Sequence, residues 1–73
     1  MNYNQAVERE VKFWPGVQAN FSHRSKHSQV TFEFNGASRF VVLPSSPGDN
    51  YRGVRNKVCE VRRTLRHLGA VRV

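Results

Sequence analysis

Apolar residues recur along this chain with two different spacings, and the order of these spacings limits the folds that it can adopt. Steps of three or four residues are typical of one helix face. Near the start of the chain, this spacing relates Tyr3, Val7, Val11 and Trp14. We expect this helix to have Asn2 as its cap and Glu8 and Glu10 on its polar side, and to end before the Pro15-Gly16 pair.

A spacing of two residues follows, which is typical of half-buried strands. It runs through residues 17–22 and again through residues 29–34. A third β-rich run covers residues 39–43, with the sequence RFVVL. The sequence therefore predicts three consecutive strands after the first helix.

The Asn35-Gly36 pair predicts a hairpin between the second and third strands, but two registers fit it. A two-residue turn would pair Phe32 with Arg39 and place this arginine on the apolar face. A longer loop would pair Phe32 with Val42 and would bury more apolar surface. Because burial usually decides register, we favour the longer loop.

Helical spacing returns after a turn-rich linker at residues 44–50. The apolar face of this last helix consists of Tyr51, Val54, Val58, Val61, Leu65 and Leu68. Asp49 or Asn50 is the expected N-cap, and Gly69 the residue that ends the helix. The opposite face carries Arg52, Arg55, Arg62, Arg63 and Arg66.

The elements follow one another as helix, three strands and helix, within 73 residues that suit a single domain, 1–73. This order predicts an α+β fold, a two-layer αβββα sandwich in which a three-stranded antiparallel sheet has both helices on one face. The same order of elements occurs in double-stranded RNA-binding domains.

Charge suggests the class of partner. Twelve Lys and Arg residues against five Asp and Glu give a net charge of +7. A small, arginine-rich chain of this kind typically binds nucleic acid or an acidic protein. No apolar run suits a membrane span, no secretory signal is visible, and the lone Cys59 excludes an internal disulfide. We therefore expect a cytoplasmic protein without a membrane partner, in which Cys59 is a buried or half-buried thiol.

The segment 22–28 contains the residues best suited to chemistry, and three interpretations of it remain open. In the first, His27 is the general base of a ribonuclease that uses the ribose 2′-hydroxyl as nucleophile, and Lys26 stabilises phosphate charge. In the second, Arg24, Lys26, Arg39 and the helical arginines hold phosphates without cleaving them. In the third, His23 and His27 are part of a polar hairpin end without further function.

Other kinds of site have little support in the sequence. His23, His27, His67 and Cys59 lack the paired spacing of a zinc site, so we expect neither a metal nor another cofactor. Trp14 and the phenylalanines mostly follow the apolar phase of their elements and are expected in the core. The place of Phe40 depends on the hairpin register.

Three blocks of the chain resemble the HicA family of toxins, which are small basic mRNA interferases with a double-stranded RNA-binding-like fold. The family's first block is a catalytic histidine at the start of a strand, its second a strand that ends near a proline, and its third a basic helix with a Leu-Gly-like end. The blocks of this chain are residues 25–32, 39–44 and 61–69. His27 matches the catalytic position.

This resemblance implies a metal-independent endoribonuclease of a toxin–antitoxin system, whose partners would be RNA and a HicB-like antitoxin. Small basic proteins of phages and prophages also look similar. They imply a non-catalytic alternative, in which the chain binds RNA or DNA or inhibits an acidic host protein.

Overall fold

The computed structural model describes residues 3–24, 27–43 and 51–73, without the side chains of Arg24, His27, Tyr51 and Arg52. The expected Asn2, Asp49 and Asn50 caps and the 44–50 linker lie outside the described residues. The elements are α1 (Tyr3–Val11), β1 (Gln18–Arg24), β2 (His27–Phe34), β3 (Ala37–Leu43) and α2 (Tyr51–His67). The predicted helix–strand–strand–strand–helix order is confirmed.

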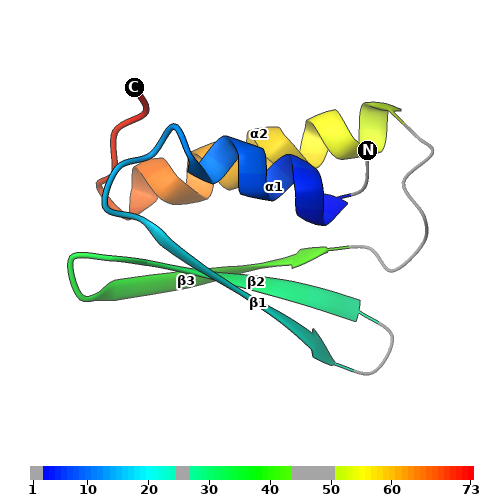
Figure 1. Ribbon diagram of the computed structural model, residues 1–73, viewed down its shortest axis with the longest axis horizontal. Helices are drawn as coiled ribbons and strands as arrows, with labels where there is room; N and C mark the ends of the chain where they lie inside the picture. The colour runs from blue at the N-terminus through cyan, green and yellow to red at the C-terminus, as the bar shows by residue number, and fades with distance from the viewer. Residues whose placement is uncertain (1–2, 25–26, 44–50) are drawn as a thin grey trace.

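The three strands form one antiparallel sheet in the order β1-β2-β3, so that β2 is central. Both helices lie on the same face of this sheet, and the other face is left open (Figure 1). The expected α+β two-layer arrangement is therefore present. None of the helices in the described part of the chain has the length and apolar character needed to cross a membrane.

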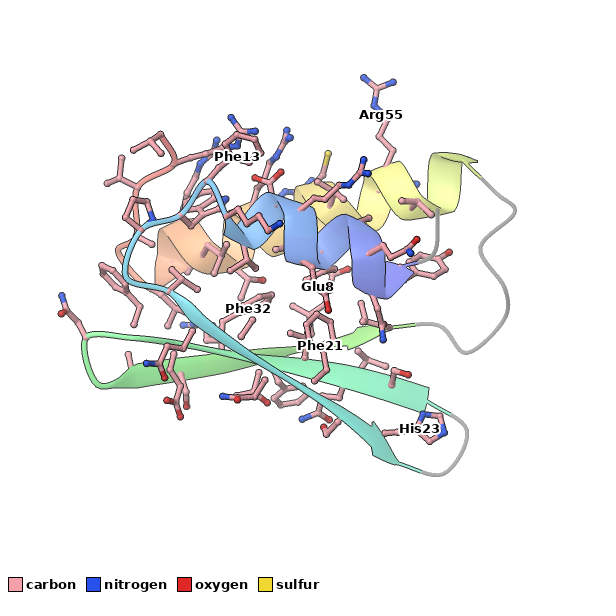
Figure 2. All side chains as sticks on the ribbon, viewed as in Figure 1. Glu8, Phe13, Phe21, His23, Phe32 and Arg55 are labelled. Carbon is pink, nitrogen blue, oxygen red and sulfur yellow. The ribbon has the colours of Figure 1, made fainter. Side chains whose placement is uncertain are left out.

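The core lies between the sheet and the helices. Phe32 is fully buried and lies between the two layers (Figure 2). The cluster around it combines residues from all the layers: Val7 and Trp14, Val30, Val41 and Leu43, and Val61 and Leu65. Because residues i and i+2 of a strand share a face, β2 and β3 bury alternate residues and leave the intervening ones on the open face.

The hairpin between β2 and β3 has the two-residue turn, so the favoured longer loop is wrong. Phe34 pairs with Ala37, and Phe32 pairs with Arg39. Asn35 and Gly36 have φ values of 52° and 80°, as a type I′ turn requires, and this turn matches the natural twist of paired strands. Burial does not forbid this register because β3 is an edge strand, where Arg39 stays exposed.

The end of α2 follows the prediction. Gly69 has a φ of 94°, and the amide of Ala70 donates to the carbonyl of Leu65 at 3.1 Å. These are the features of a Schellman C-cap.

The expectation for Cys59 is wrong, because this thiol is exposed. It follows Val58 by a single helical step, about 100° around the axis, which turns it away from the sheet.

Two glycines with left-handed backbones allow a test of the packing at the closed end of the hairpin. A Cβ on Gly36 would meet nothing within 4 Å, whereas a Cβ on Gly16 would lie 3.2 Å from Cε1 of Phe34. Gly36→Ala is expected to cost about 1–2 kcal/mol through its backbone conformation. Gly16→Ala is expected to cost more, because it also displaces the Phe34 ring. Urea unfolding of both variants measures the difference, and equal losses would show that Phe34 moves freely.

Candidate nucleic-acid interface

The positive charge of this protein is unevenly divided between its two layers. Among the side chains that the structure describes, Arg39 is the one Lys or Arg of the sheet. The other described cations belong to the helices or to the segments that directly follow them: Arg9, Lys12, Arg55, Lys57, Arg62, Arg63, Arg66 and Arg72. The helical layer is therefore the strongly basic side of the molecule.

Three of the predicted nucleic-acid contacts are exposed on α2. Arg55, Arg63 and Arg66 all reach solvent, and none has an ion-pair partner among the described residues. Figure 2 shows Arg55 pointing away from the sheet. Arg39 is also exposed, on β3. These four arginines are thus available to a polyanion.

Arg62, a further predicted contact, instead takes part in an ion-pair cluster around Glu10. The Glu10 residue is only 4% exposed, contrary to the expected polar position on α1. Its carboxylate accepts hydrogen bonds from Trp14 Nε1 at 2.7 Å, Arg62 Nη2 at 3.1 Å and Arg72 Nε at 2.8 Å. A buried carboxylate is tolerated here because three donors, two of them charged, surround it.

The protonation of Glu10 is controlled by these contacts. Burial raises the pKa of its carboxyl group, but hydrogen bonds from Arg62, Trp14 and Arg72 together outweigh burial and hold the pKa below its ordinary value. The hydrogen bond to Glu10 in turn raises the pKa of the Arg62 guanidinium. The cluster is therefore fully ionised at neutral pH.

The C-terminal segment is attached to the helical layer through the same cluster. The guanidinium carbon of Arg72 lies 4.5 Å from the centroid of the Phe13 ring, a cation–π geometry. The amide of Val73 donates to the carbonyl of Phe13 at 2.8 Å. The expectation that Phe13 is a core residue is therefore wrong: the residue is 45% exposed, and Arg72 lies over its ring.

A groove of about 310 Å³ lies between the two helices, and the residues Glu10, Phe13, Arg62 and Arg72 of this cluster form part of its lining. Its walls are largely apolar and include Ala6, Val54 and Val58. Its cationic lining consists of Arg9, Arg55, Arg62 and Arg72. Arg62 and Arg72 are paired with Glu10, which also lines the groove, so the cations that a negatively charged ligand would contact here are Arg9 and Arg55.

A second groove, of about 480 Å³, separates the edge strand β3 from the C-terminal part of α2. It is lined by Ala37, Ser38, Arg39, Phe40, Thr64, His67 and Leu68. His67 also lines a neighbouring hollow of about 300 Å³ together with Arg63 and Arg66. The two hollows thus meet at His67.

The predicted catalytic segment lies at the opposite end of the sheet from the Asn35-Gly36 turn. Arg24 ends β1 and pairs through its backbone with His27, which begins β2. The side chains of both, and all of Lys26, lie outside the described residues, as does the side chain of Arg52. His23 is described: it is exposed and its Nδ1 lies 3.3 Å from Oγ of Ser28.

The structure brings some predicted residues together and adds others. Arg39 shares a hollow with α2, and Arg63 and Arg66 adjoin it, whereas Arg55 belongs to the groove between the helices. Sequence reasoning missed the contributions of His67 and of the tail residue Arg72, because neither lies within a periodic basic pattern.

No group of three His, Cys, Asp or Glu within the described ranges could hold a metal ion.

Comparisons of the chain with protein-family models, curated proteins and solved structures found no match. The HicA resemblance therefore stays a prediction.

The Glu10 cluster predicts acid sensitivity. The native pKa of Glu10 lies below its ordinary value of 4.5, so the stabilisation is fully present above that value and is lost as pH falls through the native pKa. Glu10→Gln is expected to cost about 1–3 kcal/mol at pH 7, because it leaves buried donors poorly matched. It should also remove part of the stability loss below pH 4.5.

Urea unfolding between pH 3 and pH 7 measures both effects. The control is Glu8→Gln on the same helix, where the carboxylate is exposed. This variant should stay within about 0.5 kcal/mol of the unmodified protein at pH 7. Equal losses from the two variants would contradict a special role for Glu10.

Proposed function

We propose that this protein binds RNA through the arginines of its helical layer and of β3. The observation that carries the proposal is the exposure of Arg55, Arg63 and Arg66 along α2, without ion-pair partners in the described part of the chain. A guanidinium group offers a planar fork of donors that matches a phosphate, and several such groups on one helix match a chain of phosphates.

We further propose that the bound RNA is cleaved at the β1–β2 turn, as in a HicA-like mRNA interferase. His27 would take the proton of a ribose 2′-hydroxyl, whose oxygen then attacks the adjacent phosphorus. The bond from phosphorus to the 5′-oxygen breaks, and that oxygen takes a proton from an acid. Lys26 would stabilise the added negative charge on the phosphate. This proposal rests on the sequence resemblance and on the position of His27 at the start of β2.

A second candidate function is the binding of an acidic protein, either an antitoxin of the HicB type or an acidic host protein. The observation that favours it is the groove between α1 and α2, where apolar walls lie beside Arg9 and Arg55, two arginines without an ion-pair partner among the described residues. An acidic segment with one apolar anchor would suit such walls better than a sugar–phosphate backbone does. Binding of such a partner would survive nuclease treatment, whereas a partner bridged by RNA would be lost.

RNA binding should be strongly salt-dependent. Each phosphate contact on a single strand contributes about 0.7 to the slope of log affinity against log salt concentration. Arg63→Gln and Arg66→Gln are each expected to lower the slope by about 0.7. Lys57→Gln is the control with the same change of formal charge. Its ammonium group already lies 3.1 Å from Glu60, so the slope should change little.

Fluorescence anisotropy with a labelled single-stranded RNA at several salt concentrations measures these slopes, and the DNA of the same sequence tests nucleic-acid preference. Equal slopes for all three variants would contradict an α2 interface. Absence of binding to either nucleic acid would leave the acidic protein as the better candidate.

The proposed cleavage leads to a prediction that is separate from RNA binding. With EDTA present, the unmodified protein should fragment labelled RNA, and His27→Ala should reduce the rate at least about 100-fold, the usual contribution of a general base. Asn20→Ala is the control, since it truncates an exposed side chain of the same sheet that lines neither groove. If the unmodified protein binds RNA without producing fragments, the binding proposal stands and the catalytic one is wrong.

A further inference from the structure

An aromatic side chain lies exposed on the edge strand next to the basic helix. Phe40 is 61% exposed, and Val42 on the same face of β3 is 43% exposed. Their neighbours on that face of β2 are Thr31 and Gln29. The open face of the sheet is thus mainly polar, with one aromatic ring at its β3 margin.

The exposure of Phe40 results from the hairpin register. Pairing of Phe32 with Arg39 places Val41 and Leu43 in the core and turns the residues between them outward. A register shifted by an odd number of residues would bury Phe40, because one step along a strand changes the face. Core packing therefore gives no reason for an aromatic residue at position 40.

The groove beside Phe40 has the composition of a nucleotide site. Its volume of about 480 Å³ lies within the usual range of small-ligand pockets. Its lining consists of polar and cationic residues of both elements (Ser38, Arg39, Thr64 and His67) and includes Phe40, whose ring turns to the open face at the β3 edge. No acidic residue is part of its described lining. Apolar surface and positive charge are both present within one hollow.

The adjoining hollow extends the positive charge along α2. It shares His67 with the first and adds Arg63 and Arg66. A base stacked on Phe40 at the β3 edge would therefore have the guanidinium of Arg39 on the neighbouring residue, and those of Arg63 and Arg66 beside the groove on α2. Stacking on an aromatic ring requires a base that is free of its neighbours, which single-stranded RNA provides.

We propose that the edge of β3, together with the groove between it and α2, binds one unstacked nucleotide of single-stranded RNA. Its base stacks on Phe40, and the flanking phosphates contact Arg39 and the Arg63–Arg66 pair. This inference rests on the proposed RNA binding and identifies the form of RNA bound. A second copy of the chain is a poorer occupant, because it would bring a further net charge of +7 to this basic margin.

The test compares Phe40→Ala with Val42→Ala on the same strand and the same open face. The probes are a labelled single-stranded RNA and an oligonucleotide of equal length whose central positions are abasic. Phe40→Ala should weaken binding of the RNA about 5- to 150-fold, the usual effect of losing one stacked base. It should leave binding of the abasic probe nearly unchanged, since that probe retains its phosphates. Val42→Ala should resemble the unmodified protein with both probes.

A second variant tests stacking directly. Phe40→Trp should retain RNA binding, and its added indole should lose fluorescence when the RNA binds but not when the abasic probe binds. The native Trp14 is buried and is not expected to respond. Circular dichroism of each variant checks that the fold is retained, which the exposure of Phe40 favours.

The outcomes separate this inference from the proposed function. If the unmodified protein binds RNA and Phe40→Ala binds it equally well, the nucleotide site is wrong while RNA binding stands. If no RNA is bound, both fail. If sedimentation shows a dimer that Phe40→Ala converts to a monomer, the ring belongs to an interface between copies, and the nucleotide site is overturned.

Discussion

Glu10 connects parts of the chain that no local interaction would hold together. Its buried carboxylate joins the end of α1, the middle of α2 and the C-terminal segment through Trp14, Arg62 and Arg72. In a chain of 73 residues, which buries a limited apolar core, this connection adds polar contacts to the apolar packing between the helices. The helical layer in turn presents the exposed arginines, so the proposed interface lies on the layer whose parts this ionised carboxylate joins.

The cations of this protein therefore have two different roles. Arg62 and Arg72 contact Glu10, and Lys57 contacts Glu60, so much of their charge is compensated within the protein. Arg55, Arg63 and Arg66 are exposed and have no such partner among the described residues. The formal net charge counts the paired cations and the exposed arginines alike. A phosphate ligand would contact mainly the exposed arginines. For this reason the proposed binding surface is smaller than the arginine content of α2 implies.

The hairpin register links the fold to the proposed nucleotide site. A two-residue Asn35-Gly36 turn brings Arg39 opposite Phe32 and exposes Phe40. Turn geometry prevailed over greater burial because β3 lies at the sheet edge, where a long side chain can reach water from the core-facing side. The same choice leaves Arg39 and Phe40 at adjacent positions of the β3 edge, where both line the groove beside α2. A surface suited to both bases and phosphates follows from one local turn.

The amino-acid sequence by itself determined the helices, the strands, their order and the Gly69 end of α2, because spacing and turn residues act through the local backbone. It also determined that α2 is rich in arginine. Only the tertiary structure decided that Glu10 is buried, because its partners Arg62 and Arg72 are 52 and 62 residues away. The tertiary structure likewise decided that Phe40 and His67 line one groove. This shared lining depends on how β3 packs beside α2, and no spacing within either element contains this information.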